Sequence, residues 1–322
     1  MKNIWASIRL PLGDKSYLQD VAVYIFRLKE GFLMVDAGLN TDESFNALLK
    51  GLSDIGYRIE DIKKLIISHY HLDHCGLASR LQKMVSVPVY LHEADKRILD
   101  FFKKHVEHYP ERVGEFFHSY GVPEDTMDFI TKELHVYKAL ILGPTDTLPL
   151  QDGDTFEIED GYIQAIYTPG HTPGHMSVFY PEKKIFFGAD FILRHEWPHG
   201  GIYPAIQDYN PIKDYLGSLK RVRQIEPEVI MPSHGEPLYD PIKRINDALN
   251  FMTSKIEEIH EILKKRGPLN LAQICDRAFR SYDSSLSYFF LLSLCLGYVR
   301  YLIEEGMAEE IRGKEAILFR GV

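Results

Sequence analysis

The stretch SHYHLDHCG, residues 68–76, places four candidate metal ligands within six consecutive positions: His69, His71, Asp73 and His74. It directly follows the apolar run Leu65-Ile66-Ile67, which is typical of a buried β-strand. Imidazole nitrogens and carboxylate oxygens together bind zinc, iron or manganese, and a short loop after a buried strand can hold several of them rigidly. Four such side chains predict one metal site and part of a second.

Three further candidate ligands lie after apolar strands later in the chain. They are His171 in TPGHTPGH, Asp190 in FFGAD and His234 in MPSHG. Each lies where Gly or Pro turns the chain, so these loops can converge at one edge of a sheet. We interpret His175 as a support outside the ligand set. Cys75 is interpreted as a small packed residue, although its position near a helix start could lower its thiol pKa.

The order of apolar segments predicts a layered α/β domain over residues 1–252. Within it, residues 93–146 change to helical segments dense in aromatic residues and histidine, which we interpret as an inserted helical lid. From residue 253 to 322, three helical segments and a terminal hairpin predict a small winged-helix-like domain.

Composition limits the classes of partner. The chain has 322 residues, a net charge of -9 and three cysteines, which we interpret as reduced thiols. The acidic balance disfavours nucleic acid, because such binding draws on clustered Lys and Arg. The N-terminal residues hold no apolar core of signal-peptide length, and no uninterrupted apolar stretch of the sequence reaches membrane-spanning length. The expected compartment is the cytoplasm.

The ordered set H-x-H-x-D-H, TPGH, GAD and SHG resembles the metallo-β-lactamase-fold hydrolases over residues 20–240. This resemblance implies an αββα sandwich with a dinuclear site at one edge. It implies one metal ion on His69, His71 and His171 and a second on Asp73, His74 and His234, with Asp190 bridging the two. Zinc is the preferred metal, and iron or manganese is open.

Two such ions would activate a shared water as the nucleophile, lowering its pKa toward about 7. Asp73 is placed to orient that nucleophile and to pass its proton to the leaving group. The prediction is a metal-dependent hydrolase that attacks the carbonyl of an ester, thioester or lactone of a small, partly hydrophobic substrate. An aromatic lid would give an apolar pocket wall, although packing between lid helices explains the aromatic residues equally well.

Branches of the resembling family narrow this prediction. Glyoxalase II and related thioesterases are similar in the metal motifs and in added C-terminal helices, but their glutathione-binding residues cannot be placed here. Acylhomoserine lactonases are similar through TPGH, yet the tyrosine they carry after the bridging aspartate is absent from residues 191–195. Arg194 or His195 in that segment could bind an anionic group or face solvent. Flavodiiron proteins carry Glu at the position of His71, which disfavours oxygen reduction.

Three other functions remain open. A phosphodiesterase or endoribonuclease could use the same metals, but the expected last helix carries Arg300 as its single cation, and a recognition helix needs several. A metal-bearing sensor or ligand-binding protein would use the site without catalysis. A persulfide dioxygenase would hold iron at a reduced site. We expect a small-molecule substrate and no membrane, with the C-terminal module packing on the main domain or forming a homodimer.

Overall fold

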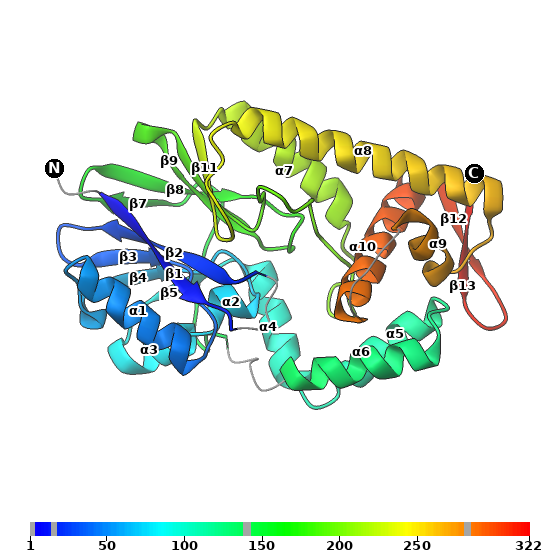
Figure 1. Ribbon diagram of the computed structural model, residues 1–322, viewed down its shortest axis with the longest axis horizontal. Helices are drawn as coiled ribbons and strands as arrows, with labels where there is room; N and C mark the ends of the chain where they lie inside the picture. The colour runs from blue at the N-terminus through cyan, green and yellow to red at the C-terminus, as the bar shows by residue number, and fades with distance from the viewer. Residues whose placement is uncertain (1–3, 14–17, 138–142, 280–284) are drawn as a thin grey trace.

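A computed structural model describes residues 4–13, 18–137, 143–279 and 285–322, and two facing β-sheets lie in the left half of the view (Figure 1). The first sheet has the order β1-β2-β3-β4-β5-β6. Its first three strands pair antiparallel, and β3 to β6 pair in parallel. Its strands are β1 (Trp5–Pro11), β2 (Asp20–Arg27), β3 (Phe32–Val35), β4 (Ile62–Ile66), β5 (Val89–Leu91) and β6 (Leu148–Pro149).

The second sheet has the order β11-β10-β9-β8-β7. Its strands pair antiparallel except for β10 and β11, which are parallel. The strands are β7 (Thr155–Ile158), β8 (Gly161–Tyr167), β9 (Met176–Tyr180), β10 (Ile185–Ala189) and β11 (Val229–Pro232). Tyr24 and Phe26 of the first sheet meet Phe187 of the second, with ring centroids 4.8 and 4.9 Å apart. The alternating apolar residues of both sheets therefore close one shared core.

Helices cover the outer face of each sheet (Figure 1). The helices α1 (Asp42–Asp54) and α3 (Ala78–Val85) bury their apolar faces on the first sheet. The helices α7 (Pro211–Ile225) and α8 (Pro241–Arg266) do so on the second. The predicted αββα sandwich is confirmed.

The expected helical insertion consists of α4 (Glu93–His105), α5 (Tyr109–Ser119) and α6 (Glu124–Tyr137), while residues 138–142 lie outside the described part of the chain. Its tip packs on the C-terminal module. Phe117 contacts Phe289 edge-on at 5.7 Å, Tyr120 stacks on Phe319, and the Leu271 amide donates to the Tyr120 carbonyl. The insertion is thus tied down at its outer end.

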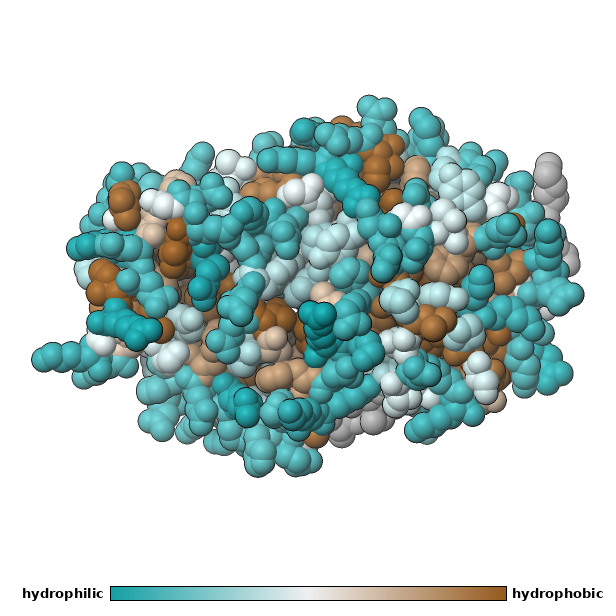
Figure 2. Space-filling model, turned by 180° about the vertical axis from the view of Figure 1, so that it is seen from behind, coloured by the Kyte–Doolittle hydropathy of each residue, from teal (hydrophilic) through white to brown (hydrophobic). Residues whose placement is uncertain are grey.

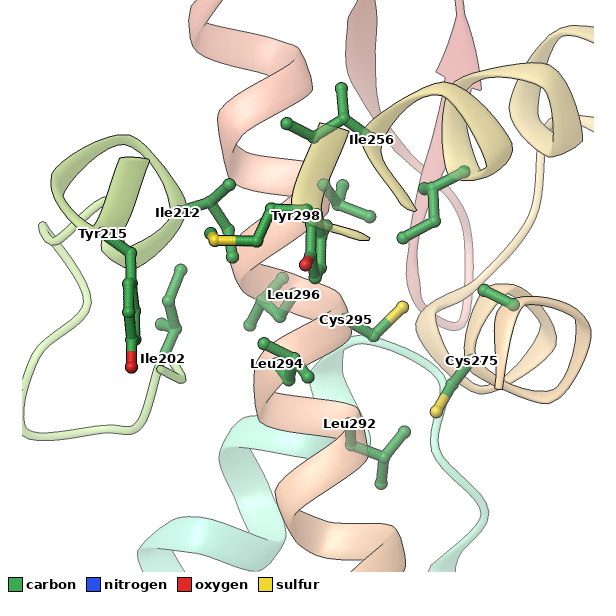
Figure 3. Packing of buried hydrophobic residues seen from close by; sticks show 14 of the residues in the cluster. Ile202, Ile212, Tyr215, Ile256, Cys275, Leu292, Leu294, Cys295, Leu296 and Tyr298 are labelled. Carbon is green, nitrogen blue, oxygen red and sulfur yellow. The ribbon is translucent and has the colours of Figure 1, made fainter. Parts of the chain in front are cut away.

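The C-terminal module contains α9 (Leu271–Ala278), α10 (Ser285–Glu304) and a hairpin of β12 (Ala308–Arg312) with β13 (Ile317–Gly321). Leu292, Leu294 and Leu296 of α10 lie among side chains from α7, α8 and α9 (Figure 3). The end of α8, together with α9 and α10, matches the three expected helical segments, and β12 with β13 matches the expected terminal hairpin. Helix α8 runs unbroken through residues 252 and 253, so the proposed division there, like the winged-helix likeness, stays a prediction.

One helix among the described residues has the length and mean hydropathy of a membrane span, although Arg300 and Glu304 interrupt its apolar sequence. Within the described residues, Ser287–Glu304 of α10 is long and apolar enough by length and composition alone, and 61% of it is buried inside the protein. A core helix is apolar on every side because it packs on several neighbours, here α6, α7 and α8. Seen from behind, hydrophilic residues cover most of the surface, with apolar residues in small separate groups (Figure 2).

Replacing Phe117 by Ala is expected to lower the free energy of unfolding by about 3–5 kcal/mol, because its fully buried ring fills the contact between the insertion and α10. Denaturant unfolding measures this loss. Phe129→Ala makes the same chemical change on α6 at a side chain that is 56% exposed, and should cost less than about 0.5 kcal/mol. Equal losses from the two variants would contradict this packing role.

Candidate metal centre

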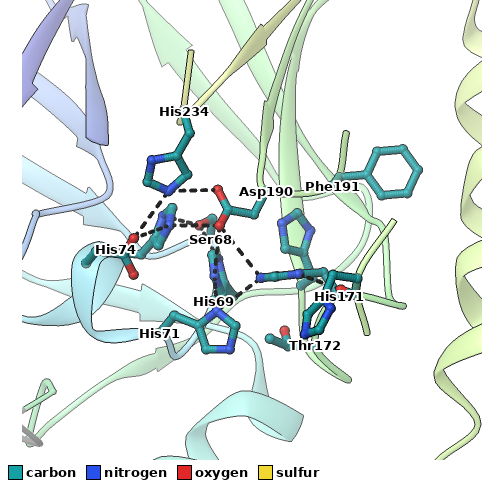
Figure 4. Close-up of polar contacts among 12 residues, drawn as sticks. Ser68, His69, His71, His74, His171, Thr172, Asp190, Phe191 and His234 are labelled. Atoms are coloured by element: carbon teal, nitrogen blue, oxygen red, sulfur yellow. Dashed lines mark hydrogen bonds and ion pairs between the residues drawn. The ribbon is translucent and has the colours of Figure 1, made fainter. Parts of the chain in front are cut away.

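The seven predicted ligand residues come together at one edge of the sandwich (Figure 4). Each lies just beyond the end of a strand or on the short helix α2 (Leu72–Cys75). His69 and His71 follow β4, Asp73 and His74 lie on α2, His171 joins β8 to β9, Asp190 follows β10, and His234 follows β11. The loops after these strands therefore converge at one edge, as the sequence predicts.

A first group of ligand atoms comes from His69, His71, His171 and Asp190. The His71 Nδ1 lies 3.0 Å from both His69 Nε2 and His171 Nε2. Asp190 Oδ2 lies 3.7 Å from His171 Nε2 and 4.0 Å from His69 Nε2. Tetrahedral zinc with Zn–N bonds near 2.0–2.1 Å separates its ligand nitrogens by about 3.3 Å, close to these values.

A second group comes from Asp73, His74 and His234. Asp73 Oδ2 lies 3.2 Å from His234 Nε2 and 3.6 Å from His74 Nε2. Asp190 reaches this group too, because its Oδ2 is 3.4 Å from His74 Nε2 and its Oδ1 is 3.4 Å from His234 Nε2. One carboxylate therefore stands between the two groups.

Four histidines turn Nε2 toward the centre because their Nδ1 atoms have partners outside it. Such outer partners set the ring orientation of a metal-binding histidine. The pairs are His69 with Ser68 Oγ at 2.9 Å, His74 with Asp36 Oδ2 at 2.8 Å, His171 with the His199 carbonyl at 2.8 Å, and His234 with the Asp20 carbonyl at 2.7 Å.

Asp36 supports the candidate metal centre from outside the two ligand groups, and sequence reasoning missed it. Its buried carboxylate accepts from the Ser68 amide at 2.7 Å and the Ser68 hydroxyl at 2.9 Å, besides its contact with His74. Its φ of 63° is left-handed, a backbone strain that often accompanies functional sites. An acidic residue directly after the apolar run FLMV was the available signal.

The two groups differ electrostatically. Burial and the neighbouring His171 lower the pKa of His71 to about 3, and burial also lowers the pKa of His69 and His171. These rings are neutral at pH 7 and keep a lone pair for a cation. At His234, burial is outweighed by Asp190 and Asp73, which raise its pKa to about 10. A cation bound there would displace a proton.

The residues present fit a pair of cations. His74 Nε2, His234 Nε2 and Asp190 Oδ1 are buried atoms without a hydrogen-bond partner among the described residues. Buried polar atoms of this kind are costly unless something satisfies them. All three face the space between the groups, and mixed imidazole and carboxylate donors suit zinc, iron or manganese. A divalent cation would satisfy these atoms.

Other residues singled out in the sequence lie around this site. His175 is buried with its Nδ1 2.9 Å from Thr168 Oγ1, outside both groups. Cys75 is buried and donates to the Tyr70 carbonyl; burial raises its thiol pKa, so the idea of a lowered pKa was wrong. Arg194 and His195 are exposed, and Arg194 donates to the Pro237 carbonyl.

The aromatic residues of the insertion divide between two roles. Phe117 and Tyr120 belong to the core shared with the C-terminal module. In contrast, Tyr109 contacts Phe102 at 4.6 Å, Phe102 contacts Tyr70 at 5.6 Å, and Tyr70 contacts His71 at 4.7 Å between ring centroids. A line of aromatic rings thus extends from the insertion to a residue of the first group.

Comparisons with known proteins agree with this geometry. A sequence model of the metallo-β-lactamase superfamily matches residues 17–234, which include both ligand groups. The probable metallo-hydrolase YqjP of Bacillus subtilis (strain 168) is 24% identical over 300 residues, 89% of this chain and 88% of that protein. An atrochrysone carboxyl ACP thioesterase of Aspergillus fumigatus is 22% identical over 260 residues, 80% of this chain and 48% of that protein.

Solved structures show the same fold. A metallo-β-lactamase family protein from Thermus thermophilus has a TM-score of 0.82 over 99% of both chains, at 24% identity. A β-lactamase domain protein from Burkholderia ambifaria has a TM-score of 0.86, covering 99% of this chain and 93% of that one, at 20% identity. Both matches extend through the insertion and the C-terminal module.

Proposed function

The chain belongs to the metallo-β-lactamase superfamily, and from this premise we propose that it is a dinuclear-metal-dependent hydrolase of carbonyl substrates. The observation that carries the proposal is the position of Asp190 within 4.0 Å of ligand atoms in both groups. A single-metal protein would not need a second set of converging histidines and carboxylates. The pairing supports two ions that share one carboxylate.

In this proposal each group holds one divalent ion, with zinc preferred. His69, His71 and His171 hold the first, and Asp73, His74 and His234 hold the second. Asp190 serves both. When bound, the ions would supply a nucleophilic hydroxide near neutral pH and polarise the substrate oxygen.

Asp73 is the proposed catalytic residue of the chain. Its side chain is 24% exposed, against 10% for His171, 9% for Asp190 and 3% for His234. Burial would raise its pKa, but His74 and His234 outweigh it and lower the value to about 2. The ionised, most accessible carboxylate can accept a proton from the attacking water and pass it to the leaving group.

The preferred substrates are small, partly hydrophobic esters, thioesters or lactones. The aromatic line of Tyr109, Phe102 and Tyr70 beside His71 supports an apolar approach to the first group. The relative named as an acyl carrier protein thioesterase supports a thioester. A nucleic-acid substrate is disfavoured, because α10 packs inside the protein and carries Arg300 as its single Lys or Arg.

A matched substrate panel tests this proposal. Protein reconstituted separately with zinc, manganese and iron is assayed on a thioester, a lactone, an aryl ester, bis-p-nitrophenyl phosphate and single-stranded RNA. We expect chelator-sensitive turnover of the carbonyl substrates with about two metal equivalents per chain. Turnover of the phosphodiesters alone would replace the proposal with the nuclease alternative. Two bound metals without turnover of any substrate would favour the sensor alternative.

A further inference from the structure

A fully buried carboxylate in the helical insertion contacts the two loops that carry the histidines of the first group. Asp95 lies in the first turn of α4, and its side chain has no exposed surface. Its Oδ2 accepts hydrogen bonds from the Tyr70 amide at 2.9 Å and the Thr172 hydroxyl at 2.7 Å, and its Oδ1 accepts one from the Gly174 amide at 2.6 Å. Three donors therefore converge on one side chain.

The positions of these donors in the chain give the contact its meaning. Tyr70 lies between His69 and His71, so its amide belongs to the backbone that sets both rings. Thr172 directly follows His171, and Gly174 lies in the same loop. The β4 and β8 loops come from different sheets. Asp95 accepts hydrogen bonds from both loops. It therefore holds His69 and His71, in the loop after β4, at a fixed distance from His171, in the loop after β8.

Gly174 shows how closely the carboxylate is fitted. A Cβ atom at position 174 would lie 2.6 Å from Asp95 Oδ1 and 2.7 Å from the Asp95 amide nitrogen. Ordinary side chains would push the β8 loop away from α4. The close approach of Asp95 therefore explains why the second glycine of TPGHTPGH, Gly174, carries no side chain.

The same contacts require a carboxylate and not merely a side chain of its size. Both oxygens already accept from donors, and an asparagine would replace one oxygen by an NH2 group. In either orientation of the amide, at least one buried donor would face another donor and lose its partner, which is costly. Asp95→Asn is thus a nearly isosteric change that breaks the contact.

We infer that Asp95 is a positioning residue for the first metal site, through which the helical insertion holds the His69, His71 and His171 ligands in place. The inference rests on the proposed function, because it presumes that these histidines bind a metal ion. Within the described part of the chain, Asp95 accepts hydrogen bonds from Tyr70, Thr172 and Gly174 and not from the second group, whereas Asp36 contacts His74 directly. Loss of Asp95 should therefore weaken the first site and spare the second.

Metal binding to the purified full chain tests the inference without an activity assay. Wild type and Asp95→Asn are titrated with zinc against a competing chelator, and with Co²⁺ while visible absorption is recorded. We expect wild type to bind about two ions, and Asp95→Asn to bind one with wild-type affinity and the other about 10–100-fold more weakly. The Co²⁺ spectrum of the weakened site should also change.

Asp61→Asn is the matched control. Asp61 accepts a backbone hydrogen bond from the Arg58 amide at 2.8 Å, but it lies at the opposite end of β4 from the metal-binding loop. It should bind both ions as wild type does. If Asp95→Asn also kept both affinities and the wild-type Co²⁺ spectrum, the inference would be overturned while the proposed function stood. If wild type itself failed to bind two ions, the proposed function would fall and this inference with it.

A second variant covers the case in which Asp95→Asn does not fold. Thr172→Val removes one of the three donors to Asp95 and keeps the shape of the buried side chain. It should weaken the first site in the same direction by about 2–10-fold. Unchanged first-site affinity in this variant would overturn the positioning role, and equal weakening of both sites would show a general loss of structure instead.

Discussion

Replacing Asp190 by Asn is expected to lower kcat/KM by more than about a thousand-fold while the protein stays folded. Asp190 is the carboxylate within reach of both ligand groups, so the change removes negative charge from both at once. Removing one hydrogen-bond donor that stabilises the charge of a transition state costs about 10²–10³ in rate. Asp190→Asn should cost more, because it weakens two cation sites together. Asparagine keeps the size of the side chain, so packing after β10 should survive.

The measurement is steady-state hydrolysis of the best substrate from the panel, together with metal content and circular dichroism of the same sample. Asp208→Asn makes the same change at an exposed residue outside both groups and should keep wild-type turnover. If Asp190→Asn kept two metal ions and near-normal turnover, the assignment of Asp190 as the shared ligand would be wrong.

Sequence reasoning succeeded where local pattern and three-dimensional position coincide. The sandwich and the membership of the metallo-β-lactamase superfamily are confirmed, as is an enzyme of the metal-dependent hydrolase class. The candidate ligands were found because each lies in a loop or short helix that follows an apolar strand, and strand ends at one edge of a sheet meet in space. The ligand roles of these residues are proposals, which the Asp190 and His171 variants test.

The supporting residues were missed for the opposite reason. Asp95 lies in the first turn of an ordinary amphipathic helix, where an acidic residue is expected from the helix dipole alone. Its positioning role depends on hydrogen bonds to Tyr70 and Thr172, which lie 25 and 77 residues away in sequence. His199 contributes its backbone carbonyl, and the type of side chain gives no information about a backbone contact. Periodicity and motif spacing carry no information about such distant partners.

The aromatic residues of the insertion show the same limit. Phe102 and Phe117 are the same residue type on neighbouring helices of one insertion. Phe117 is buried against the C-terminal module, whereas Phe102 contacts Tyr70 beside the metal centre. Sequence alone left pocket wall and core packing equally open; Phe117 packs in the core, and Phe102 packs against Tyr70 beside the metal centre. Whether a ring packs on the C-terminal module or beside the metal centre depends on how α4 and α5 pack against the rest of the protein, and local sequence does not determine that packing.

Replacing His171 by Ala should abolish hydrolysis, by more than about a thousand-fold, whereas His175→Ala should cost about 10–100-fold. The two histidines lie four residues apart in one loop, both are shielded from solvent, and burial lowers the pKa of each. The pKa shifts therefore do not separate them. Geometry does, because His171 Nε2 lies 3.0 Å from His71 Nδ1, while His175 bonds Thr168 outside both groups.

The comparison is measured as kcat/KM at saturating zinc, with metal content and denaturant unfolding on both variants. His171→Ala should lose about one metal equivalent, because the first group would keep His69 and His71 without its third ring. His175→Ala should keep both ions, lose stability because it leaves a cavity beside His69 and Phe191, and lose the smaller part of the activity because the His69 ring is less firmly held. The reverse order of activity losses would place His175 in the ligand set and remove His171 from it.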